Sequence, residues 1–204
     1  LTTGYGPSHQ ATEDIALMRG IPGLTIIDPC DALDIEQAVP QMAAHNGPVY
    51  MRLLRGNVPL VLDEYDYQFE LGKAKRLVDG DEVLIVSSGF LTMRALEVAK
   101  ALQADRIGVG VLHCPTIKPL DVATILAEVQ RKPRLVVVAE NHSVVGGLGE
   151  AVASALLQNG VQPTRFRLAG LPDAYLDAGA LPTLHDRYGI STEALSARVK
   201  AWLK

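Results

Sequence analysis

The residues best suited to catalysis lie near the start of the chain. Gly6-Pro7 predicts a tight turn, and Ser8, His9 and Gln10 follow it directly, just before a predicted helix. An imidazole in this position can act as a general acid or base, or donate a hydrogen bond to a developing oxyanion. A histidine that only caps the helix or packs locally is the alternative, and the spacing alone favours neither. His9 is therefore a candidate catalytic residue.

Arg55 is a second candidate, for binding rather than catalysis. It follows a predicted strand, 48–54, and precedes the turn residues Gly56-Asn57. Ligands of open α/β sheets bind outside the carboxyl ends of the strands, where a guanidinium can grip a phosphate or carboxylate at two points. A surface salt bridge explains Arg55 equally well. Arg52, within the strand, is interpreted as structural.

A third polar stretch, Glu140-Asn141-His142, precedes a glycine-rich turn at 146–149 and a predicted helix. A strand, a glycine-rich turn and a helix N-terminus are typical of phosphate binding. The glycine spacing matches neither the dinucleotide-binding fingerprint nor the P-loop. The favoured interpretation is that these glycines permit a close turn against a neighbouring element.

The elements around the first two candidates alternate helix and strand. Residues 10–19 and 31–45 have helical periodicity, whereas 24–27 and 48–54 have the pattern of short buried strands. The segment predicts an α-β-α-β fragment with parallel strands. A fragment of about 60 residues would be marginal alone. We expect it to be the end of a larger domain, whose other strands this chain does not supply.

The rest of the chain predicts a second α/β unit. Its strands, rich in Val, Ile and Leu, indicate a mainly parallel sheet covered by helices on both faces, in three layers. Residues 63–72 are non-periodic and predict a linker or an arm along the surface. The predicted strands are 82–87, 107–113, 135–140 and 164–168, and the predicted helices are 91–103, 120–131, 147–158 and 192–203.

The composition excludes several classes of function. A net charge of −4 lacks the basic face that nucleic-acid binding needs, and the longest apolar runs are far too short to cross a membrane. Cys30, Cys114 and the remaining histidines show no metal-ligand or redox spacing, so we expect no metal site in this chain. Free thiols, with no basic and apolar leader, favour the cytoplasm.

Motifs spread in order over nearly the whole chain carry a resemblance to one family. They are Gly6-Pro7-Ser8-His9-Gln10 with Glu13-Asp14, Arg19-Gly20-Ile21-Pro22-Gly23, Pro29-Cys30-Asp31, Arg55-Gly56-Asn57, Gly80-Asp81 with Ser88-Gly89, Glu140-Asn141-His142 with Gly146-Gly147-Leu148-Gly149, Gly170-Leu171-Pro172-Asp173 and Tyr188-Gly189-Ile190. Together they resemble the C-terminal half of transketolase and its thiamine-diphosphate-dependent relatives.

The resemblance implies a domain organisation and two site residues. Residues 1–63 match the C-terminal part of the pyrimidine-binding domain, 64–74 a linker, and 75–204 the family's C-terminal domain. His9 matches the histidine that faces the cofactor's thiazolium and the substrate's carbonyl end, where it stabilises an oxygen or moves a proton. Arg55 matches the arginine that grips the sugar phosphate.

The resemblance also implies what the assembled enzyme contains. The function is transfer of a two-carbon ketol unit between sugar phosphates, with thiamine diphosphate and Mg²⁺ or Ca²⁺. The glutamate that activates the cofactor and the Gly-Asp-Gly diphosphate motif are not in this sequence. We therefore expect the chain alone to be inactive and to bind no cofactor tightly. A homodimer, and a separate N-terminal transketolase subunit, are the expected partners.

Departures from the pattern leave alternatives open. Tyr5 stands where many transketolases place an aspartate that reads a substrate hydroxyl. The Arg-Gly-Asn at 55–57 is also similar to 1-deoxy-xylulose-5-phosphate synthase. That enzyme and the β subunit of a 2-oxo-acid dehydrogenase are alternatives within the family. A non-catalytic dimerisation or regulatory module is the alternative of another class.

Overall fold

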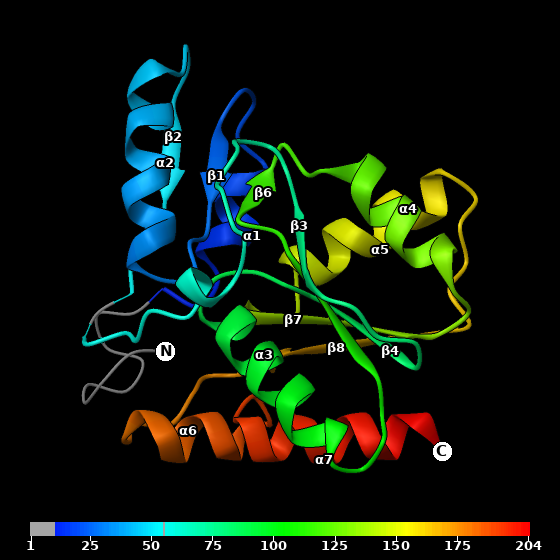
Figure 1. Cartoon of the computed structure of the whole chain (residues 1–204). Helices are drawn as coiled ribbons and strands as arrows, with labels where there is room; N and C mark the ends of the chain where they lie inside the picture. Colours follow the sequence, from blue (N-terminus) through cyan, green and yellow to red (C-terminus); the bar gives the residue numbers. More distant parts are fainter. Residues whose placement is uncertain (1–10, 55) are drawn as a thin grey trace.

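The computed structural model describes residues 11–54 and 56–204, which form two sheets with helices around them (Figure 1). In chain order the elements are α1 (Asp14–Arg19), β1 (Thr25–Ile27), α2 (Ala32–Ala44), β2 (Val49–Met51), a 3₁₀ turn (Leu62–Glu64), β3 (Lys75–Val78), β4 (Val83–Ser87), α3 (Phe90–Gln103), β5 (Val109–His113), β6 (Thr116–Lys118), α4 (Val122–Arg131), β7 (Leu135–Ser143), α5 (Leu148–Gln158), β8 (Arg165–Leu171), α6 (Leu181–Arg187) and α7 (Thr192–Leu203).

The larger sheet has the strand order β3-β5-β4-β7-β8. β5, β4, β7 and β8 are parallel, and only the edge strand β3 is antiparallel. Alternate residues of β4 face opposite ways: Val83 and Ile85 pack with α3 and α7, and Leu84 and Val86 pack with α4 and α5. Figure 1 shows α3, α6 and α7 on one side of this sheet and α4 and α5 on the other. The three-layer, mainly parallel α/β prediction is confirmed.

The smaller sheet, β2-β1-β6, departs from one expectation. β1 and β2 are parallel, as predicted. The expectation that the chain supplies no further neighbour for these strands is wrong, because β6 pairs with β1 in antiparallel orientation. β6 follows β5 after a two-residue bend, and three residues are too few to carry a strand pattern. The smaller sheet therefore contains strands from both ranges of the sequence.

Residues 63–72, predicted as a linker or an arm along the surface, are partly buried. Tyr67 and Phe69 are 6% and 4% exposed and join a cluster with α2 and the start of α3. Gln37 and Gln41 of α2 exchange hydrogen bonds with the backbone of residues 69 and 71. The segment therefore packs beside α2, where its aromatic rings fill the space and glutamine amides pair part of its backbone.

Two further differences concern short elements. β3 and α6 were not predicted, since β3 is a four-residue edge strand with exposed basic residues and α6 has only seven residues. The first helix was predicted to start at residue 10, but it begins at Asp14 because the chain before it is held by contacts with other segments. Within the described residues, none of the helices combines the length and apolar character needed to cross a bilayer.

Candidate functional site

A polar cluster forms where β1, β2 and β7 end. Arg52 follows β2, and its Nε and Nη2 donate to the two carboxylate oxygens of Asp14 at 2.8 and 3.1 Å. Its Nη1 lies 3.3 Å from Oδ1 of Asp28, which follows β1. The Arg52 side chain is only 13% exposed. Two carboxylates therefore compensate one buried guanidinium, and the bidentate bond to Asp14 fixes its orientation.

The two carboxylates have further donors. Tyr50 donates its hydroxyl to Asp14 Oδ2 at 2.8 Å, and Ser88 donates to Asp28 Oδ2 at 2.7 Å. Burial and the Asp14 carboxylate raise the pKa of Tyr50 to about 12, so the phenol stays protonated and donates. Burial lowers the pKa of Arg52, but Asp28 and Asp14 outweigh it and raise the pKa overall. The guanidinium of Arg52 therefore keeps its charge at neutral pH while the phenol of Tyr50 stays neutral.

His142 joins β7 to the start of α1. Its Nδ1 lies 2.7 Å from the carbonyl oxygen of Ser143, and its Nε2 lies 3.3 Å from the backbone nitrogen of Ala16. The carbonyl can only accept and the amide can only donate, so the ring carries its proton on Nδ1. Burial lowers the pKa of His142, which agrees with this neutral form. His142 is therefore a structural link between two segments.

Glu140 occupies the helix N-terminus that resembled a phosphate site. Its two carboxylate oxygens accept from the backbone N–H groups of Leu148 and Gly149 at 2.7 and 2.9 Å. A Cβ at Gly147 would lie 1.9 Å from Glu140 Oε2, so glycine is required there for this close approach. The glycines serve a close turn, the interpretation favoured above, and the chain's own carboxylate takes the place of a phosphate.

We predict that Glu140 makes the chain less stable as the pH rises. Burial raises its pKa from the ordinary 4.5 to about 7. Between these pH values the folded chain binds a proton that the unfolded chain has lost, so the free energy of unfolding falls with rising pH. By linkage, Glu140→Gln should remove about 3 kcal/mol of this fall, measured by urea unfolding at pH 4.5 and pH 8.

The matched control is Glu150→Gln, which changes an exposed carboxylate in the first turn of the same helix. It should keep the wild-type dependence on pH because Glu140 is intact. Equal pH slopes for wild type and Glu140→Gln would contradict the assignment.

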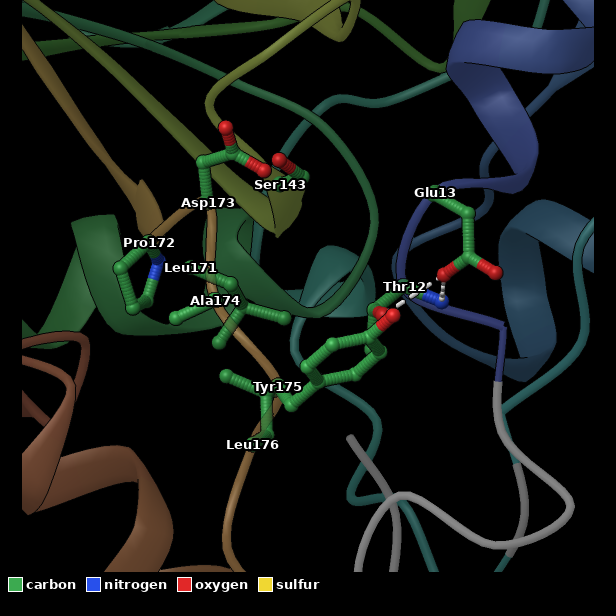
Figure 2. A pocket seen from close by; sticks show the side chains of 9 residues that line it. All are labelled: Thr12, Glu13, Ser143, Leu171, Pro172, Asp173, Ala174, Tyr175 and Leu176. Carbon is green, nitrogen blue, oxygen red and sulfur yellow. Dashed lines mark hydrogen bonds between the residues drawn. The ribbon is translucent and has the colours of Figure 1, made fainter.

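A cleft of about 650 Å³ lies beside this cluster (Figure 2). Thr12 and Glu13 line one side, residues 171–176 line the other, and Ser143 lies between them. The Glu13 carboxylate accepts from the hydroxyl and the backbone N–H of Thr12, and these bonds lower its pKa. The lining is mixed: hydroxyls, two carboxylates and the fully exposed Tyr175 lie beside four apolar residues, Leu171, Pro172, Ala174 and Leu176.

Both predicted site residues, His9 and Arg55, lie outside the described residues. In the sequence, His9 precedes Thr12, which lines the larger cleft, by three residues. The neighbours of Arg55, namely Leu54, Gly56 and Asn57, line a second cleft of about 250 Å³. Cys30 and Asp31, which follow β1, line it too, so this cleft lies at the carboxyl ends of β1 and β2.

Family models match most of the chain. The transketolase pyrimidine-binding domain matches residues 2–61, and the transketolase C-terminal domain matches residues 72–195. The chain belongs to the transketolase family. The resemblance inferred from the motifs is thereby confirmed, and the α/β fold agrees with it.

Relatives of this transketolase-family chain include separate subunits. A transketolase family protein of Sinorhizobium fredii, y4mN, is 71% identical over all of this chain and 59% of its own length. The 6-deoxy-6-sulfo-D-fructose transketolase subunit SqwH of a Clostridium species is 38% identical over 93% of this chain and 58% of its own. The chain thus spans about three-fifths of the curated relatives it matches first.

Solved structures and synthases extend the comparison. The structure of a split-gene transketolase, described as an inactive β4 tetramer, is 37% identical over 96% of this chain and 62% of its own, with a TM-score of 0.84. A 1-deoxy-D-xylulose-5-phosphate synthase of Geobacter sulfurreducens is 30% identical over 97% of this chain, but only 31% of its own length is covered.

Transketolase-family membership implies dependence on thiamine diphosphate, whose diphosphate end needs a cation and phosphate-binding groups. Among residues 11–54 and 56–204, no group of three or more His, Cys, Asp or Glu side chains is arranged to hold a metal ion. The glycine-rich helix N-terminus of α5 is filled by Glu140. The diphosphate and metal end of the cofactor therefore does not fit the described part of the chain.

Analysis of the sequence missed Asp14, Asp28 and Tyr50. Asp28 and Arg52 each directly follow a strand, the position that identified Arg55, so the same rule could have found them. That Arg52 is structural agrees with its contacts. Asp14 had no comparable signal because its partners lie 38 and 36 residues away in the sequence.

Proposed function

We propose that this chain is the C-terminal subunit of a transketolase-type enzyme that transfers a two-carbon ketol unit between sugar phosphates. One observation carries most weight: the match to a split-gene transketolase over 96% of this chain at 37% identity. The relative SqwH is likewise named a transketolase subunit. In this proposal the assembled enzyme, in the cytoplasm, binds thiamine diphosphate with Mg²⁺ or Ca²⁺ through a second polypeptide, and the chain alone is inactive.

Two residues of this chain act on the substrate in the proposal. His9 donates a hydrogen bond to the carbonyl end of the substrate, or moves a proton there. Arg55 binds the phosphate of the acceptor sugar, because a buried dianion needs a charged donor and a guanidinium offers two parallel N–H groups. The cleft lined by both sequence neighbours of Arg55 supports this role.

A partner polypeptide and a homodimer are part of the same proposal. Five large apolar side chains in the range 11–63 are 46–69% exposed, and in this proposal another chain covers them. The five are Leu17, Ile21, Val39, Leu53 and Leu60.

The test is reconstitution with an N-terminal transketolase subunit, thiamine diphosphate and Mg²⁺. We expect the mixture to transfer a ketol unit from a ketose phosphate to an aldose phosphate, and the chain alone to be inactive. Turnover of pyruvate with an aldose phosphate would instead favour a 1-deoxy-xylulose-5-phosphate synthase activity, which the synthase relatives support. Pyruvate turnover without an aldose would favour a 2-oxo-acid dehydrogenase β subunit. A stable complex inactive with all of these would favour the non-catalytic module.

A further inference from the structure

The guanidinium of Arg52 has no donor left for a substrate. Besides the bonds to Asp14 and Asp28, its Nη1 and Nη2 lie 3.4 and 3.3 Å from the carbonyl oxygen of Asn141. Nη2 also lies 3.3 Å from the carbonyl oxygen of Ala11. An arginine has five N–H groups, and these contacts account for all of them. Arg52 therefore acts on other parts of the protein and does not bind a ligand directly.

These contacts join four segments of the chain at one point. Asp28 and Arg52 follow β1 and β2, Asn141 lies in β7, and Ala11 and Asp14 belong to the chain that follows His9 by two residues. The backbone N–H of Arg52 also donates to the carbonyl oxygen of Ile27 at 2.9 Å. Because its own backbone is tied to β1, the arginine is a fixed support and not a flexible surface side chain.

The chain after His9 is also held by bonds from other segments. Ser143 donates its backbone N–H to the carbonyl oxygen of Thr12 at 2.7 Å, and Ala16 donates to His142. Arg19 donates to the carbonyl oxygens of Gly146 and Gly147 at 2.5 and 3.0 Å. Arg52 supplies the bond to Ala11, the anchor nearest to His9 in this set, and it also holds Asp14 through two bonds, beside the one from Tyr50.

We infer that Arg52 is a positioning residue, which holds the chain that follows His9 against the carboxyl ends of β1, β2 and β7 so that the imidazole stays aligned with the substrate. The inference rests on the proposed function for its catalytic part. A displacement of about 1 Å can lower a rate about 100-fold, so loss of a rigid support has a large expected effect. Lysine carries the charge without the planar fork and cannot reproduce the paired bonds to Asp14.

The experiment compares variants of the reconstituted enzyme with Arg187→Met as the matched control. Arg187 pairs with Asp177 on the surface, where their side chains are 54% and 61% exposed. We expect Arg52→Met to lower kcat about 100-fold while the KM for the acceptor phosphate changes by less than about twofold. The kcat of Arg52→Lys should fall about tenfold, and the kcat of Arg187→Met should equal that of the wild type. A kcat for Arg52→Met within about twofold of wild type would overturn the inference.

Hydrogen exchange of the purified chain gives a readout that does not depend on activity. In Arg52→Met the amides of Ala16 and Ser143, which bond across the anchored segment, should exchange about tenfold faster while those of β4 keep their protection. Faster exchange throughout the chain would show a general structural role and contradict positioning. If Arg52→Met does not fold, the exchange of the same amides is compared in Arg52→Lys and Asp14→Asn, and that comparison tests the inference. If the wild type transfers no ketol unit, the proposed function fails, and the exchange still decides whether Arg52 anchors this segment.

Discussion

Replacing His9 with alanine in the reconstituted enzyme is expected to lower kcat about 10²–10⁴-fold, the usual contribution of a general acid or base. Because the imidazole acts on the reacting carbonyl, kcat should fall while the KM for the acceptor sugar phosphate changes little. Steady-state rates of ketol transfer, measured with the acceptor varied, give both constants.

His45→Ala is the matched control for this variant. His45 follows α2, and its Nε2 lies 3.2 Å from the Thr25 hydroxyl, so it belongs to the structural scaffold. His45→Ala should keep kcat close to that of the wild type. If His9→Ala also keeps the wild-type rate, the histidine has no catalytic role and the non-catalytic module becomes the better account.

The second large effect concerns stability. Asp34 of α2 and His113 of β5 form a pair with both side chains fully buried, Oδ2 to Nε2 at 2.9 Å. Asp34 also accepts from the Tyr67 hydroxyl and the backbone N–H of Cys30, and His113 Nδ1 lies 2.7 Å from the Thr92 hydroxyl. The network therefore joins the residues beside the smaller sheet to the larger sheet.

Asp34→Ala is expected to lower the free energy of unfolding by about 3–5 kcal/mol, because it leaves the buried His113, Tyr67 and Cys30 donors without their acceptor. Urea unfolding measures the change. Glu64→Ala, which removes an exposed ion pair with Lys100, should cost less than about 1 kcal/mol. An equally small cost for Asp34→Ala would show that the network does not hold the two sheets together.

The same network predicts that the stability of the fold decreases at acid pH. Burial raises the pKa of Asp34, but His113 and the hydrogen bonds from Cys30 and Tyr67 together outweigh it and lower the pKa overall. A carboxyl with a lowered pKa in the fold adds stability above its ordinary pKa and loses this stability as the pH falls through the lower value. The free energy of unfolding of Asp34→Asn should therefore fall less steeply at acid pH than that of the wild type.

The sequence predicted the parts of the fold that depend on long apolar runs. The four parallel strands of the larger sheet and four of its helices lie within a few residues of their expected ranges, since buried parallel strands such as Leu135–Ser143 have an unmistakable composition. The edge strand β3 and the short strand β6 were missed because pairing with distant residues, rather than local pattern, makes them strands.

The candidate site likewise contains residues that local sequence identified and residues that depend on distant contacts. A turn motif and a strand end identified His9 and Arg55 from local sequence, and their roles stay predictions. The ion cluster of Asp14, Asp28 and Arg52 depends on contacts between residues 24 to 89 positions apart, and no local pattern reveals this pairing, although strand ends mark Asp28 and Arg52. The burial of Tyr67 and Phe69 depends likewise on α2, so a segment that looked like a linker contributes two side chains to the core.

The most direct test of the account follows the two-carbon unit itself. A ketose phosphate labelled with ¹³C at its first two carbons is incubated with an aldose phosphate, thiamine diphosphate, Mg²⁺ and this chain reconstituted with an N-terminal transketolase subunit. The account predicts that both labelled carbons appear together in a new ketose phosphate, and only when both polypeptides are present. Label that stays in the donor in the complete mixture, or that moves without this chain, would contradict it.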